Sequence, residues 1–180
     1  VPVAPVALVF DYTSAWAWAI QPQGQDFSYF SVLFDAYRAL RRAGLTVDIL
    51  PPDTDRLADY KLVLIPGLFA WNDGLLEQIK RHTGQVLSGP RAGSRTEDVF
   101  RTENGAPVVM ISGTAAYLGA WPDETGWDRI VAWATQKTAI ATTSLSEGVR
   151  LRDTATHRFA FNYASEARIL DGRTLEPAGV

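Results

Sequence analysis

The sequence contains no cysteine, which excludes a disulfide, a thiolate nucleophile and a metal or iron–sulfur site held by thiolates. Only two histidines occur, His82 and His157, so a site built from several histidines is excluded as well, and we expect neither a metal nor a cofactor. No segment approaches the ~20 consecutive apolar residues of a membrane span. The apolar start of the chain also lacks the basic flank of a signal peptide. These absences favour a cytoplasmic protein without a membrane partner.

The chain also lacks a marked excess of charge of either sign. The 180 residues include 17 basic and 20 acidic side chains, a formal net charge of −3, and both halves of the chain carry nearly equal numbers of each sign. A basic surface for nucleic acid is therefore not expected. Hydrophobic residues make up 47% of the chain, which is enough for one main domain with a small appendage. Because the sequence begins with valine, we expect a piece excised from a longer protein.

The first 90 residues alternate between strand and helix patterns. Short apolar segments bounded by turn residues predict four strands, at 6–10, 46–50, 62–65 and 85–87. A helix is expected from Asp26 to Arg42 and another from Asn72 or Asp73 to His82. In the first helix, the three- and four-residue spacing predicts that four large side chains face the core: Phe30, Leu33, Phe34 and Tyr37. The alternation predicts an α/β fold with a mainly parallel sheet between helices.

The later part of the chain has a different pattern. Segments 108–111 and 115–118 flank a Ser-Gly-Thr turn and predict a hairpin. Asp123 is expected to cap a helix that buries Trp127. After Gly148, alternating apolar residues separated by turn residues predict a small antiparallel β domain. We therefore expect an α/β domain at 1–140 and a β domain at 145–180.

The residues typical of catalysis are few. Ser88 ends the fourth predicted strand, but the nucleophile-elbow pattern G-x-S-x-G would need glycine where Val86 and Pro90 stand. Adjacent carboxylates occur only in polar loops, and His82 and His157 have no evident acid or nucleophile partner. A serine hydrolase that uses Ser88 is therefore a remote alternative, and we assign no catalytic residue.

Tryptophan is unusually frequent, with six residues, and two of them lie in the segment that follows the first strand. Trp16 and Trp18 stand beside Tyr12 in a segment interpreted as a loop from Tyr12 to Gln25, and on an extended chain both would face the same side. Three interpretations stay open: local core, a protein interface, and a platform for a sugar or another ligand. Arg91 and Arg95, in the loop after the fourth strand, are further candidates for ligand or interface contact.

Six segments together resemble the non-catalytic part of family 42 β-galactosidases. They cover almost the whole chain: VALVFDYTS at 6–14, FDAYRALRRAG at 34–44, TVDILP at 46–51, YKLVLIP at 60–66, VLSGPRAGSRTED at 86–98 and YLGAWPD at 117–123. The resemblance implies a trimerisation domain with a flavodoxin-like fold of the class I glutamine amidotransferase type, followed by a small C-terminal β domain. It also implies two partners, namely further copies in a homotrimer and the catalytic barrel of the parent enzyme.

The chain departs from this family in two respects. Only residues 99–116 separate the last two segments, where the family has a longer stretch, so we expect an internal deletion or gap near 99–106. The family's two catalytic glutamates lie on a (β/α)₈ barrel of about 250 residues, which this chain is too short to contain. The superfamily's nucleophilic cysteine is missing too.

The resemblance therefore implies the non-catalytic, trimer-forming portion of an enzyme that hydrolyses terminal β-D-galactosides with retention. A stand-alone amidotransferase-like module that binds a small ligand or sugar is the alternative.

Overall fold

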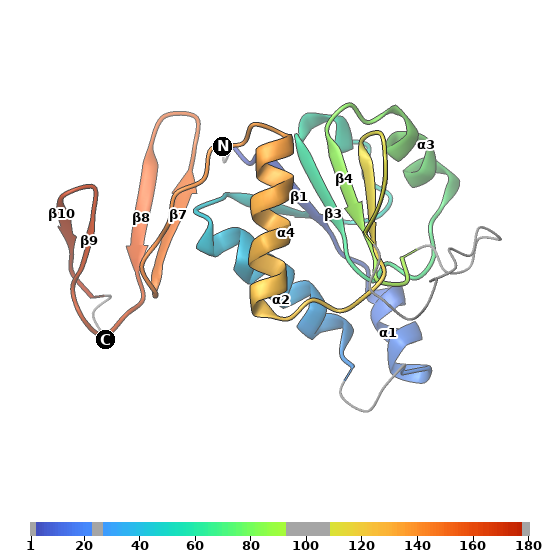
Figure 1. Cartoon of the computed structure of the whole chain (residues 1–180), viewed down its shortest axis with the longest axis horizontal. Helices are drawn as coiled ribbons and strands as arrows, with labels where there is room; N and C mark the ends of the chain where they lie inside the picture. The colour runs from blue at the N-terminus through green and yellow to red at the C-terminus, as the bar shows by residue number, and fades with distance from the viewer. Residues whose placement is uncertain (1–2, 23–26, 93–108, 178–180) are drawn as a thin grey trace.

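The computed structural model describes residues 3–22, 27–92 and 109–177, and these form a three-layered α/β unit followed by short antiparallel strands (Figure 1). The central sheet has the strand order β2-β1-β3-β4-β6-β5. Its strands are β1 (Val6–Val9), β2 (Val47–Leu50), β3 (Leu62–Ile65), β4 (Gln85–Ser88), β5 (Val109–Ser112) and β6 (Ala115–Leu118). Five strands run parallel to one another, namely β2, β1, β3, β4 and β6, whereas the edge strand β5 is antiparallel to β6. The predicted mainly parallel sheet is confirmed.

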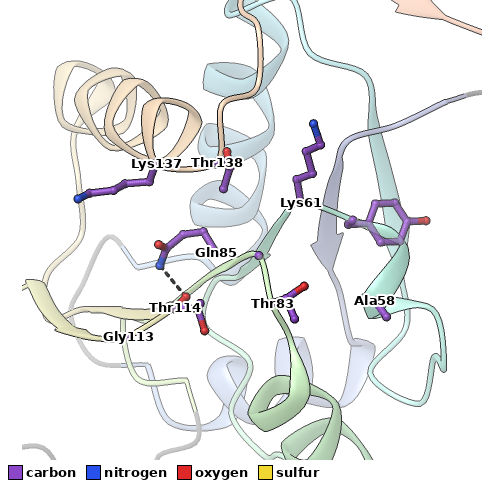
Figure 2. Close-up of a pocket in the computed structure, with 10 residues that line it drawn as sticks. Ala58, Lys61, Thr83, Gln85, Gly113, Thr114, Lys137 and Thr138 are labelled. Carbon is purple, nitrogen blue, oxygen red and sulfur yellow. Dashed lines mark hydrogen bonds between the residues drawn. The ribbon is translucent and has the colours of Figure 1, made fainter.

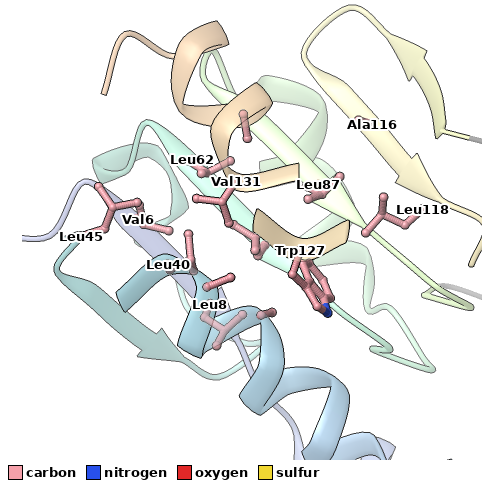
Figure 3. Packing of buried hydrophobic residues seen from close by; sticks show 14 of the residues in the cluster. Val6, Leu8, Leu40, Leu45, Leu62, Leu87, Ala116, Leu118, Trp127 and Val131 are labelled. Carbon is pink, nitrogen blue, oxygen red and sulfur yellow. The ribbon is translucent and has the colours of Figure 1, made fainter. Parts of the chain in front are cut away.

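One face of the sheet is covered by α2 (Tyr29–Arg42) and α4 (Glu124–Lys137). Alternate strand residues meet these helices, as Figure 3 shows for Leu8, Leu62 and Leu87 against Leu40 and Trp127. The opposite strand residues pack against α3 (Asp73–Arg81) and the 3₁₀ turn η1 (Leu57–Asp59). Because both faces are covered, β1 and β3 are buried at every position, which explains their continuous apolar sequence.

The face that α2 turns to the core differs in part from the prediction, since Leu33 and Tyr37 pack against the core as expected but are only partly buried. Phe30 and Phe34 are 52% and 57% exposed, so the expectation that they pack against the sheet is wrong. Val32, Ala36 and Leu40 are buried instead, together with Tyr29 and Ala39. Alanine allows α2 to lie close to α4 and the sheet, and both stripes have the same helical spacing. Ser28 caps the helix by accepting a hydrogen bond from the Ser31 N–H, and the predicted cap Asp26 lies outside the described residues.

The segment interpreted as a loop forms a helix, α1 (Tyr12–Ile20), which is a second correction. Asp11 starts it, because its carboxylate accepts hydrogen bonds from the N–H groups of Thr13 and Ser14 at 3.1 and 2.8 Å. The predicted hairpin of β5 and β6 and the Asp123 cap of α4 are confirmed.

The C-terminal strands form two hairpins, β7 (Val149–Asp153) with β8 (Arg158–Asn162) and β9 (Arg168–Leu170) with β10 (Arg173–Leu175). They lie at the end of the molecule away from α3 (Figure 1). The hydroxyl of Thr46 accepts a hydrogen bond from the Asp153 N–H at 2.9 Å, and α2 contacts β7, so this unit is attached to the main sheet. None of the helices in the described ranges is long and apolar enough to cross a membrane.

Candidate functional site

An apolar stripe lies on the outer face of α1. Tyr12, Trp16 and Ile20 are spaced four residues apart, so they share one side of the helix, and all three are exposed. Large apolar side chains gathered on one surface are typical of a contact site for another molecule. Tyr12 and Trp16 therefore remain candidates for an interface.

Trp18 faces the opposite way and belongs to the core. It is 3% exposed, against 66% for Trp16, so the prediction that the two face the same side is wrong. The Trp18 indole N–H donates a hydrogen bond to the carbonyl of Gly67 at 2.8 Å, and its ring contacts Phe27 and Phe69. A helix turns each residue by about 100°, which separates positions 16 and 18 widely around the axis.

The exposed phenylalanines of α2 extend this surface. The Phe10 ring contacts Tyr12 at 4.7 Å and Phe30 at 5.8 Å between ring centroids, which connects the face of α1 with that of α2. One turn further along α2, Phe34 lies beneath the Arg38 guanidinium, 5.7 Å from the ring centroid. We refer to Tyr12, Trp16, Ile20, Phe30 and Phe34 as the helical apolar surface.

A second set of exposed aromatic rings follows the C-terminal strand β8. Phe159, Phe161 and Tyr163 project from the same side of the strand, and their rings stack at 6.5 and 6.2 Å between centroids. All three are exposed, although their alternation would be typical of a buried sheet face. Tyr163, the residue after β8, and Phe34 of α2 line one groove, so this aromatic ladder ends beside the helical apolar surface.

Of the two candidate arginines, one is described. Arg91 is exposed, its backbone N–H donates to the Tyr117 hydroxyl at 2.8 Å, and its guanidinium lies 5.7 Å from the centroid of the Trp18 ring. These contacts hold Arg91 at the carboxyl end of β4, over the core tryptophan. Arg95 lies outside the described residues.

Ser88 is buried at the end of β4, and its hydroxyl lies 3.5 Å from the carbonyl oxygen of Ala116, at the limit of a hydrogen bond. No contact of this hydroxyl with a histidine occurs within the described ranges. Its position suits a strand-to-loop turn rather than an activated nucleophile.

The two histidines lie in unlike surroundings. His82 follows α3, is buried, and has no hydrogen-bond partner for either ring nitrogen, and this burial lowers the pKa of its imidazole. His157 is exposed just before β8, and its ring lies against Phe159. No group of three or more metal-ligating side chains occurs among the residues that the structure describes.

A polar pocket of about 550 Å³ opens at the amino ends of β3, β4 and β6 (Figure 2). The Gln85 amide donates a hydrogen bond to the Thr114 carbonyl at 2.8 Å across its floor. Lys61 and Lys137 border the pocket, but their ammonium groups point away from each other (Figure 2), so they do not converge on one anion. Ligands of parallel α/β sheets usually bind at the opposite, carboxyl ends of the strands.

The fold agrees with what known proteins indicate. The family model described as "Beta-galactosidase trimerisation domain" matches residues 4–110, more than half of the chain. The chain belongs to this family. The matched residues include β1 to β4 and α1 to α3 of the α/β unit, and the resemblance to family 42 β-galactosidases is confirmed.

Curated relatives of this trimerisation domain are whole enzymes. A β-galactosidase from Thermus thermophilus is 32% identical over 220 residues, which include 91% of this chain and 34% of the relative. The β-galactosidase BgaA of a Thermus species is 31% identical with the same coverage. The chain thus spans about a third of the length of the relatives it matches.

Solved structures give the same result. The crystal structure of a β-galactosidase from the psychrophilic Marinomonas ef1 matches with a TM-score of 0.85 and 27% identity, over 94% of this chain and 34% of that chain. The β-galactosidase of the Antarctic haloarchaeon Halorubrum lacusprofundi matches with a TM-score of 0.80 and 22% identity, over 98% of this chain and 39% of that chain, which shows a shared fold. The match extends beyond residue 110 and includes the C-terminal strands.

Sequence reasoning missed several residues of the candidate surface. Phe30 and Phe34 were assigned to the core, and the ladder on β8 was read as an ordinary strand pattern. One sequence signal points to their exposure. On α2, Ala36 and Ala39 stand three residues apart and offer a second, closely packing face.

Proposed function

We propose that the chain is the part of a β-galactosidase that holds a homotrimer together, and that the parent enzyme hydrolyses terminal β-D-galactosides. The family match over residues 4–110 carries this proposal, supported by relatives that are named β-galactosidases. The catalytic carboxylates would lie on a barrel in the remaining part of the parent, which is the chain's second partner. By itself, the chain is expected to be inactive towards galactosides.

The helical apolar surface and the β8 ladder support the assembly role. Burying one large apolar side chain yields about 1.5–3 kcal/mol, so a surface with several exposed aromatic rings has much to gain from a partner. Interface centres favour tryptophan and tyrosine, which places Tyr12 and Trp16 among the candidate anchors. Arg91 is a candidate at the rim, since it is exposed beside the same helix.

Domain boundaries and fold type form a second part of the proposal. We assign residues 1–140 to an amidotransferase-like trimerisation domain and residues 145–180 to a small β domain. An alignment of 220 residues with the Thermus thermophilus relative is longer than this whole chain of 180, which supports a shortened or missing stretch, as expected near 99–106. A cytoplasmic location and a lack of nucleic-acid partners are in keeping with the absence of cysteine and the even charge distribution.

Sedimentation equilibrium of the purified chain tests the assembly role directly. We expect a species of three times the 19.8 kDa chain mass, in reversible exchange with the monomer. A chain that stays monomeric at high concentration would contradict self-assembly by this part alone. A dimer would contradict a three-fold arrangement.

A chromogenic β-galactoside assay tests the division of labour. We expect no turnover, because about 250 residues of barrel are needed to place the two carboxylates. The matched control is Ser88→Ala, which should change nothing. Hydrolysis that disappears in this variant would assign the chemistry to Ser88 and contradict the proposed non-catalytic role.

A further inference from the structure

A basic groove lies between α2 and the C-terminal strands, within the exposed aromatic surface. It has a volume of about 370 Å³, and its lining consists of Phe34, Tyr37, Arg38, Arg41, Gly148, Arg150 and Tyr163. The three arginines come from two separate elements, while Phe34 and Tyr163 form exposed aromatic walls. In a chain with a net charge of −3, this concentration of positive charge is local.

The groove arginines are not neutralised within the described part of the chain. Arg41 and Arg150 each donate to a backbone carbonyl, of Leu45 and Val149 respectively, both at 2.6 Å, and neither forms an ion pair there. Arg38 has one distant carboxylate partner, Asp35, at 3.9 Å. A guanidinium has five N–H donors, so most donors of these three groups remain available for a further acceptor.

Arg42, next to Arg41, is neutralised by ion pairs, unlike the groove arginines. It lies outside the groove lining and is bound by two carboxylates, Glu124 at 3.1 Å and Asp128 at 2.6 Å. Asp153, whose charge interacts with Arg41, is held by two hydrogen bonds from Arg158. The carboxylates of Glu124, Asp128 and Asp153 are thus already engaged.

Repulsion among the arginines adds to the tendency to bind an anion. Burial lowers the pKa of Arg150, and the positive charges of Arg41, Arg42 and Arg38 lower it further. Tyr37 acts in the opposite direction and raises the pKa of Arg150. A carboxylate that entered the groove would relieve this repulsion and could form paired hydrogen bonds with a guanidinium.

An acidic loop lies towards the other end of the molecule. Asp53 and Asp55 follow β2, are exposed, and form no ion pair with any described residue. The loop is fixed to α3, because the side chains of Gln78 and Asn72 donate to the carbonyls of Thr54 and Pro52. The loop is therefore held against α3, whereas the groove is lined in part by β7, and α3 and β7 lie towards opposite ends of the molecule (Figure 1).

We propose that the basic groove of one copy binds the Asp53–Asp55 loop of the next copy in the trimer. This inference rests on the proposed function and names a contact that would hold neighbouring copies together in the trimer. A closed three-fold ring needs a heterologous interface, in which each copy offers two different and complementary surfaces. The groove and the loop are such a pair: opposite in charge and located towards opposite ends of the molecule. Charge complementarity would fix the orientation, while the aromatic walls supply buried apolar area.

Charge exchange across the contact provides the test, by sedimentation equilibrium of the 180-residue chain. The groove variant is Arg38→Glu with Arg150→Glu, and the loop variant is Asp53→Arg with Asp55→Arg. We expect each to weaken association about tenfold or more, because each places like charges opposite one another. The chain that carries all four substitutions restores opposite charges and should recover to within about threefold of wild type.

A matched control is Lys61→Glu with Arg129→Glu. This variant makes the same change in net charge on exposed side chains that lie outside the groove, and it should associate like wild type. Circular dichroism should give wild-type spectra for every variant. If the groove variant does not fold, Arg38→Gln with Arg150→Gln keeps the test available, with a smaller loss in the same direction.

The outcomes separate the two proposals. A wild-type chain that stays monomeric overturns the assembly role and the contact together. A trimeric wild type with an unchanged groove variant overturns the contact alone. The contact is also overturned if the groove variant associates more weakly and the chain with all four substitutions does not recover. The groove would then bind some other acidic segment.

Discussion

Trp16 and Trp18 lie two residues apart on α1, yet truncating each one to alanine should affect a different property of the chain. Trp18→Ala should lower the stability of the fold, whereas Trp16→Ala should weaken association. Trp18→Ala removes a buried indole that packs against Phe27 and Phe69 and binds the Gly67 carbonyl. Truncation of a buried tryptophan to alanine typically costs about 3–5 kcal/mol of unfolding free energy. Since domains are stable by only about 5–15 kcal/mol, Trp18→Ala should leave a marginal fold.

Trp16→Ala should behave differently, because its indole is mostly exposed. Surface substitutions usually change the unfolding free energy by less than about 0.5 kcal/mol. If Trp16 anchors an interface, its truncation to alanine should cost about 2 kcal/mol of association free energy per contact. That corresponds to an increase of roughly 30-fold in the dissociation constant.

Two measurements on the same preparations separate these effects. Urea unfolding followed by circular dichroism, at concentrations where the chain is monomeric, reports the stability of the fold. Sedimentation equilibrium at higher concentration reports association. Trp16→Phe serves as the conservative control and should keep most of the association.

Either of two results would refute this reasoning. Equal losses of unfolding free energy in Trp16→Ala and Trp18→Ala would mean that both side chains are buried, and that the orientation of α1 is wrong. A Trp16→Ala variant with unchanged stability and unchanged association would remove Trp16 from the interface.

Three further predictions concern single residues. Because burial lowers the pKa of His82, the unfolded chain binds a proton more readily, so the unfolding free energy should fall as the pH drops below about 6.5, by at most about 1.4 kcal/mol per pH unit. His82→Leu should flatten that part of a melting-temperature profile, and an equally steep profile would exclude His82 as its cause. Asp11→Ala should lower the urea-unfolding free energy by about 1 kcal/mol, through loss of the α1 cap, whereas an unchanged value would show that this cap is dispensable. Gly89→Ala should prevent stable folding, judged by circular dichroism, because its φ is +97° and a Cβ atom would lie 2.2 Å from the Leu118 carbonyl oxygen; a wild-type spectrum would contradict this packing.

The parallel sheet could be predicted from sequence because its strands are buried on both faces. β1 and β3 each show an unbroken apolar run that ends at Asp11 or at Pro66 and Gly67, and such runs have few other interpretations at this length. The caps of α3 and α4 were also readable, since Asn72 and Asp123 stand directly before periodic apolar residues.

Helix α1 was missed because its sequence has no clear polar face. Apolar residues fill 15–20 without interruption, so helical periodicity is weak, and the tryptophans suggested an irregular binding loop. The cap signal was nevertheless present, since Asp11 stands three residues before Ser14 at the end of a strand. Local capping chemistry decided the conformation, while hydrophobic pattern alone was uninformative.

The sequence of α2 contains two apolar stripes with the same helical spacing. Choosing between them by side-chain size alone selects the wrong one. A rule that places the largest apolar residues inside selects Phe30 and Phe34, whereas close packing of α2 on the sheet selects Ala36 and Ala39. Choosing between them needs the distance between α2, α4 and the sheet, which is a property of the tertiary structure.

The error on α2 has a physical origin that also bears on function. Pattern reasoning assumes that a chain buries its apolar residues in its own core, and that assumption fails where a second molecule supplies the other half of the contact. Trp16, Phe30 and Phe34 break the rule at neighbouring places, and Phe159 and Phe161 break it again on β8. An isolated domain gains nothing from leaving these rings in water, whereas a subunit of an oligomer gains the free energy of their burial on assembly. These exposed residues are therefore the ones to vary first when the proposed trimer contact is tested.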